Sequence, residues 1–136
     1  MSTQMEPTRL LAILALIGLL GVEYGGWALL TFITGRDGLS DAQLRWFRAG
    51  HAHAGTLLVL SLVYFRYLSD TSLSMTLRWT GGVLMLAGIL GQAGGFFVHM
   101  ASGARTANSA GTRVTRSGGL LLGSALLLLT TGLATA

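Results

Sequence analysis

Apolar residues dominate four long stretches of the chain, and short polar links separate them. A membrane-spanning helix needs about 20 mostly apolar residues. The stretches that meet or approach this length are residues 10–34, 46–68, 77–101 and 118–136. Links this short make consecutive helices antiparallel neighbours. The pattern therefore predicts an all-α integral membrane protein with a single domain, an antiparallel up-down four-helix transmembrane bundle.

The links contain residues that end or begin helices. Gly35 and Gly38 interrupt the first stretch, and Ser40 followed by Gln43 predicts a capping box at the start of the second helix. Residues 69–72 separate the second and third helices, and residues 102–112 form the longest polar link. The first stretch is longer than the apolar core of about 7–15 residues in a signal peptide, so we expect it to be a retained span.

Composition supports the membrane assignment. The chain has 136 residues, of which 51% are hydrophobic and 10% charged, whereas soluble domains carry about 25% charged residues. Its mean hydropathy is +0.63. There is no cysteine, which excludes disulfides and thiolate ligands. The net charge of +4 comes from arginines that flank apolar stretches, so we expect the lipid bilayer as a partner and no nucleic acid.

The distribution of arginines predicts an orientation. The links after the first and third helices, with their flanks, hold Arg36, Arg45, Arg48, Arg105, Arg113 and Arg116; the opposite side holds Arg9, Arg66 and Arg78. Cytoplasmic loops carry the excess of basic residues. We therefore expect a protein of the bacterial cytoplasmic membrane with both termini on the non-cytoplasmic side.

Three histidines and one glutamate lie inside the predicted spans, where ionisable groups indicate a functional site. His51 and His53 are about 200° apart on a helix, so a regular helix cannot bring both to one ion. If the second helix enters the bilayer near Phe47, His51 lies about 6 Å deep, and His99 lies at a similar depth near the end of its antiparallel helix. Glu23 lies midway along the first helix and is a candidate metal ligand or proton carrier.

Other polar residues and glycines cluster around these positions. Arg45 and Arg48 precede His51, and their guanidinium groups suit haem propionates or lipid headgroups. Gln92 lies two turns before His99 and is a candidate for hydrogen bonds to a ligand or for a proton relay. Gly21 and Gly25, like Gly91 and Gly95, have the small-xxx-small spacing of closely packed membrane helices. The same glycines could leave room for a flat cofactor, and both interpretations favour an oligomer.

The segment Arg48-Ala49-Gly50-His51-Ala52-His53-Ala54-Gly55 resembles the helix that supplies a low-spin haem ligand in the haem-copper oxidase and nitric oxide reductase superfamily. The resemblance covers these eight residues. It implies one haem b, with His51 or His53 on one face and His99 on the other. Because the chain has only three histidines, the resemblance does not imply a haem-copper centre or oxygen reduction.

Three functions are compatible with the sequence. The first is a small membrane protein or subunit that binds haem b or a transition metal through His51, His53, His99 and, for a metal, Glu23, and that transfers electrons. The second is an oligomeric channel or transporter for protons, cations or small molecules that uses Glu23 and the histidines. The third is an accessory subunit of a larger membrane complex. No hydrolase elbow or phosphate-binding loop is present, and whether the chain is an enzyme stays open.

Overall fold

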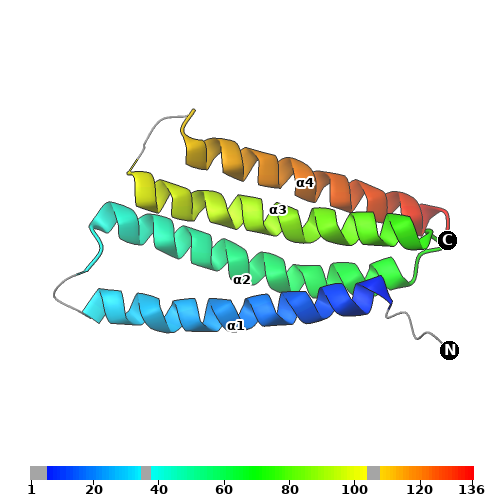
Figure 1. Cartoon of the computed structure of the whole chain (residues 1–136), viewed down its shortest axis with the longest axis horizontal. Helices are drawn as coiled ribbons and strands as arrows, with labels where there is room; N and C mark the ends of the chain where they lie inside the picture. Colours follow the sequence, from blue (N-terminus) through cyan, green and yellow to red (C-terminus); the bar gives the residue numbers. More distant parts are fainter. Residues whose placement is uncertain (1–5, 35–37, 104–107) are drawn as a thin grey trace.

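The computed structural model describes residues 6–34, 38–103 and 108–136. They form four helices and no strand: α1 (Pro7–Thr34), α2 (Asp41–Ser69), α3 (Met75–Ser102) and α4 (Ala110–Ala134). The helices run back and forth along one long axis, and the two termini lie at the same end (Figure 1). We call this end, with the α2–α3 link, the terminal end. The opposite end, with the other two links, is the distal end.

Serine caps begin three of the helices. The predicted capping box is confirmed, because Ser40 accepts a hydrogen bond from the Gln43 backbone and the Gln43 side chain bonds back to Ser40. Ser74 and Ser109 cap α3 and α4 in the same way, through the backbone amides three residues on. The predicted break at residues 35–37 lies outside the described residues.

The start of α4 corrects the prediction for the third link. Residues 102–112 were expected to be a polar link, but α4 begins at Ala110, eight residues before the predicted span. The first two turns contain Thr112, Arg113 and Arg116, and they are helical because Ser109 caps them. Apolarity marks where a helix meets lipid and does not mark where the helix begins.

Three of the helices, α1, α3 and α4, are long and apolar enough to cross a membrane, which indicates a membrane protein. Helix α2 is as long as the others, with 29 residues. It does not reach the same apolarity because its first half holds Asp41, Arg45, Arg48, His51 and His53. Among the four helices, α2 thus has the most charged and histidine side chains, and it lies between α1 and α3 (Figure 1).

Helices α2 and α3 occupy the middle of the bundle, whereas α1 and α4 lie at its edges and do not contact each other. Glycines bring α3 and α4 together: a Cβ atom on Gly118 would lie 2.6 Å from the carbonyl carbon of Gly91. The predicted close approach of helices at Gly91 and Gly95 is therefore confirmed for α3 and α4. The apolar core is largest toward the terminal end, where Leu11, Phe65 and Leu68 are almost fully buried.

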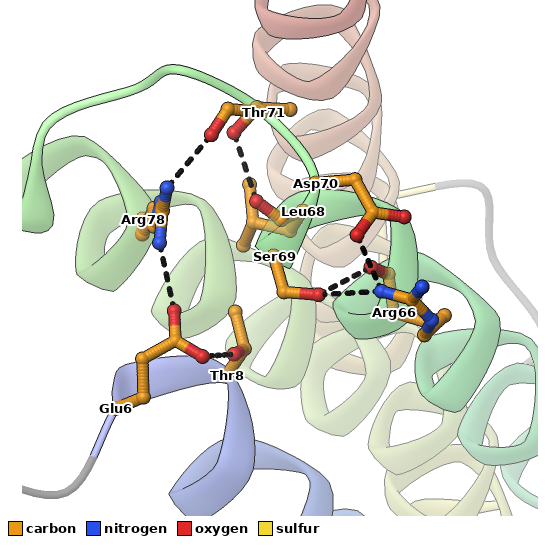
Figure 2. A network of polar contacts seen from close by, with 8 residues as sticks. All are labelled: Glu6, Thr8, Arg66, Leu68, Ser69, Asp70, Thr71 and Arg78. Atoms are coloured by element: carbon orange, nitrogen blue, oxygen red, sulfur yellow. Dashed lines mark hydrogen bonds and ion pairs between the residues drawn. The ribbon is translucent and has the colours of Figure 1, made fainter.

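At the terminal end, polar contacts join the start of α1 to α3 and to the α2–α3 link. Arg78, at the start of α3, donates hydrogen bonds to the Glu6 carboxylate (2.8 Å) and to the carbonyl of Thr71 (2.7 Å). Figure 2 shows that this guanidinium joins the beginning of α1 to the α2–α3 link, while Arg66 pairs with Asp70 on the surface. Both described ion pairs lie at this end, so two of its arginines are neutralised.

Candidate functional site

An apolar groove of about 520 Å³ lies between α1 and α3, with α2 as its floor. We call it the α1/α3 groove. Its lining includes Gly18, Gly21 and Gly25 from α1, Phe47 and His51 from α2, and Gly94 and Phe97 from α3. A Cβ atom on Gly21 or Gly94 would meet nothing within 4 Å, so these glycines border open space. Leu14, Gly21 and Leu90 are exposed, and the groove therefore opens on the outer surface of the bundle.

His51 is the one ionisable side chain in the lining of this groove. Its imidazole lies against bare backbone of α1: a Cβ on Gly25 would lie 3.3 Å from Nδ1, and one on Gly26 would lie 3.5 Å from Nε2. The Phe47 ring, one turn away, stacks at 6.3 Å and helps to hold the ring plane. No hydrogen bond joins either ring nitrogen to another described residue. His51 is thus a half-buried imidazole at an apolar groove, and the described residues leave its ring nitrogens without a hydrogen-bond partner.

His53 lies on another side of α2. Its ring packs on Phe96 of α3, with centroids 4.7 Å apart, and Nδ1 lies 3.0 Å from the carbonyl oxygen of Ala49. The side chain is exposed. As the 200° separation predicts, His53 does not share the surroundings of His51.

His99 is buried between α2 and the start of α4, with 6% of its surface exposed. It stacks on Trp46, with ring centroids 4.5 Å apart and planes 17° apart. Its Nδ1 lies 3.5 Å from Oγ of Ser109, and its Nε2 lies 3.3 Å from Oγ1 of Thr112. Both ring nitrogens therefore have hydroxyl partners at the start of α4, from the capping residue Ser109 and from Thr112.

The expected match in depth between His51 and His99 is not found. His99 is level with Trp46, which precedes His51 by five residues, or about 7.5 Å along α2. The expectation measured the two depths from separate helix ends, whereas packing sets the level of α3 against α2 and places His99 beside Trp46. The structure does not bring the three histidines together. Within residues 6–34, 38–103 and 108–136, no three His, Cys, Asp or Glu side chains are grouped so that they could hold a metal ion.

The remaining candidates are also dispersed. Arg45 and Arg48 are exposed in the first turns of α2, and neither bonds to a described residue; Arg48 lies one turn before His51. Glu23 is two residues from both Gly21 and Gly25, so at about 100° per residue it lies on the far side of α1 from the groove. Gln92 lies where α3 meets Gly118 of α4. Of the candidates, His51 and Arg48 share one side of α2.

Sequence reasoning did not single out the partners of His99. Trp46 is not among the predicted site residues, and Ser109 and Thr112 fall in the predicted polar link at residues 102–112. A sequence signal existed for the helix start, because serine is a preferred N-cap residue and Ser109 precedes the helix. The orientation of that helix start toward His99 follows from packing and has no local signal.

Comparison with known proteins gives no relative: no family model, no curated protein and no solved structure matches this chain. The function is therefore argued from the groove and its histidine alone.

Proposed function

We propose that this chain is a four-span protein of a bacterial cytoplasmic membrane that binds haem b in the α1/α3 groove, with His51 as the axial ligand. A bound haem supplies one-electron redox chemistry at its iron. The chain supplies the ligand, an apolar enclosure and a nearby positive charge. Electron transfer within the membrane is the function that these parts favour.

The observation that carries the proposal is the position of His51. It is an imidazole without a hydrogen-bond partner among the described residues, and it lines a groove that is otherwise apolar. Leaving a polar group unpaired in apolar surroundings is unfavourable. A ligand that bonds to the ring nitrogen removes this cost, and neutral imidazole is a common ligand of haem iron.

The groove also suits the shape of a haem. Its volume of about 520 Å³ is within the range of about 300–1,000 Å³ for cofactor sites. Glycines on two of its walls, Gly21 and Gly94, leave open space beside the backbone, where a flat ring can lie. Arg48 is one turn from His51 toward the distal end, and its guanidinium can bond a propionate at the membrane surface.

The alternatives have less support. A proton relay through Glu23 and the histidines needs these groups to face one another or to line one water-filled path. His51 packs against one side of α1, however, and Glu23 is exposed on the other side of that helix. A transition-metal site made by all three histidines needs them to converge. For haem, one histidine at an apolar groove is sufficient.

The proposed orientation places the distal end in the cytoplasm. Of the nine arginines, six belong to that end and three to the terminal end. At the terminal end, Arg66 and Arg78 are each paired with a carboxylate, whereas Arg45 and Arg48 at the distal end are exposed and unpaired among the described residues. The difference in positive charge between the ends is therefore larger than the arginine count indicates.

The test is an absorption spectrum of protein purified in mild detergent from a host that makes ample haem. Spectra of the oxidised and dithionite-reduced protein, with elemental iron on the same sample, should show one haem per chain. His51→Gly should lose the haem and regain it when imidazole is added, which separates ligation from folding. His53→Ala should keep it. Wild-type protein that is folded, colourless and free of iron would overturn the proposal.

A second pair of variants tests the location. Gly21→Leu should abolish haem binding because its side chain enters the groove, where nothing lies within 4 Å of the Cβ position. Gly119→Leu is the matched control, since Gly119 also faces open space but lies on α4, away from the groove. Equal haem content in both variants would place the cofactor elsewhere.

A further inference from the structure

The outer face of α1 has a carboxylate among apolar side chains. Glu23 is exposed, and on the same face lie the exposed residues Leu16, Leu20 and Trp27, at spacings of three or four residues. No bond from its carboxylate to another described residue is found. A charged group midway along a membrane span is costly when it faces lipid, and such groups generally have a partner. The described residues offer Glu23 no partner, and a neighbouring copy of the chain can supply one.

An exposed histidine on α2 offers a matching group. Nδ1 of His53 is 3.0 Å from the carbonyl oxygen of Ala49. Because a carbonyl oxygen only accepts hydrogen bonds, Nδ1 carries a proton in this arrangement. Nε2 is then an acceptor, and the described residues provide no donor for it. A hydrogen bond between the Glu23 carboxyl group and this nitrogen gives a pair that shares one proton and has no net charge in the membrane.

The two groups lie at the same depth. Glu23 is eleven residues before the distal end of α1 at Thr34, or about 17 Å. His53 is twelve residues after the distal end of α2 at Asp41, or about 18 Å. Arg48 lies about 10 Å from the same end of α2. A second copy in the same membrane orientation therefore presents its His53, and not an arginine, at the level of Glu23.

We propose that copies of this chain assemble head to tail, with the outer face of α1 in the groove between α2 and α4 of the next copy and with Glu23 bonded to the neighbour's His53. This second groove, the α2/α4 groove, has a volume of about 280 Å³ and is lined by Leu57, Leu60, Tyr64, Leu122, Leu126 and other apolar residues. The proposal is independent of what the α1/α3 groove binds.

The apolar residues beside the pair fit this geometry. Helix α1 of one copy runs antiparallel to α2 of the next when both copies have the same orientation. From Glu23 toward the terminal end the outer face continues with Leu20 and Leu16, and from His53 in the same direction α2 continues with Leu57 and Leu60. Leu20 therefore lies opposite Leu57.

The two contact surfaces are different, since one belongs to α1 and the other to α2 and α4. Helices α1 and α4 lie at opposite edges of the bundle (Figure 1). Different surfaces make a heterologous contact, which closes into a ring when the rotation between copies allows it. We therefore expect a cyclic oligomer larger than a dimer.

Cysteine cross-linking in intact membranes tests the contact directly, because the natural chain has no cysteine. The full-length variant with both Leu20→Cys and Leu57→Cys should form disulfide-linked multimers on mild oxidation. Each single variant should stay monomeric on a denaturing gel. Leu120 provides the control in place of Leu57, because it is 75% exposed and does not line the α2/α4 groove. Leu120 lies five residues before Ala125 on α4, and Leu57 lies seven residues before Tyr64 on α2. Since Tyr64 bonds to the carbonyl of Ala125, the two leucines are at similar depths.

Each outcome decides the proposal. Multimers from Leu20→Cys with Leu57→Cys, and not from Leu20→Cys with Leu120→Cys, support it. Cross-linking of Leu20→Cys alone indicates an α1–α1 contact and overturns it, as does an equal yield with the control or no cross-linking at all. In the protein with Leu20→Cys and Leu57→Cys, the added change Glu23→Leu should abolish the multimers. Exchange of the two residues, Glu23→His with His53→Glu, should in contrast keep the pair and the multimers. Multimers that are insensitive to these changes overturn the Glu23–His53 pairing.

Discussion

Replacement of Gly118 by alanine is expected to separate α4 from α3. A Cβ atom at this position would lie 2.6 Å from the carbonyl carbon of Gly91 and 2.8 Å from Cα of Gln92. The amide nitrogen of Gln92 would be closer still. Carbon atoms that are not bonded pack best at about 3.5–4.0 Å, so the two backbones must move apart by at least about 1 Å. The obstacle is backbone, which cannot rotate away as a side chain can. Overpacking of this kind costs about 1–3 kcal/mol.

Gly119→Ala is the matched control, one residue away on the same helix. A Cβ there would meet nothing within 4 Å, and alanine favours a helix over glycine by up to about 1 kcal/mol. Unfolding free energies can be measured in detergent by titration with dodecyl sulfate, followed by circular dichroism. We expect Gly118→Ala to be less stable than Gly119→Ala by about 2 kcal/mol or more. Equal stability of the two variants would refute the close α3–α4 crossing.

Two further changes test other contacts with the same assay. Tyr64→Phe removes the hydroxyl that donates to the carbonyl of Ala125 at 3.1 Å, and should cost about 1 kcal/mol because the bond joins α2 to α4 in a buried position. Arg78→Gln removes the half-buried bond to Glu6 and should increase amide hydrogen exchange in the first turn of α1, whereas Arg66→Gln should change little because its pair is exposed. Equal exchange in the two arginine variants would contradict the fastening role of Arg78.

Helix number and most helix boundaries were predictable because apolar length and serine caps are local signals. The predicted spans fall inside α1, α2 and α3, and the Ser40–Gln43 box begins α2 as expected. The start of α4 was missed because its first two turns are polar, and a search for apolar stretches does not detect a polar helical turn. The capping serine at Ser109 was the signal that could have corrected it.

The site was predictable only in part. The histidine-rich segment was located on the second helix, and the 200° argument anticipated that His51 and His53 would have different surroundings. The expected opposition of His51 and His99 depended on an assumed entry point for α2 and on the rotation of α3. Both are decided by how the helices pack.

The sequence by itself determined four helices, their short antiparallel connections and the presence of imidazoles inside two of them, because hydrophobic length, caps and residue identity are properties of the local chain. Only the tertiary structure decided which side of each helix meets which neighbour. Glycine notches set these rotations: α4 packs closely on α3 at Gly91 and Gly118, whereas Gly25 and Gly26 accommodate the ring of His51. That packing leaves His51 at an apolar groove, encloses His99 beside Trp46 and turns Glu23 outward.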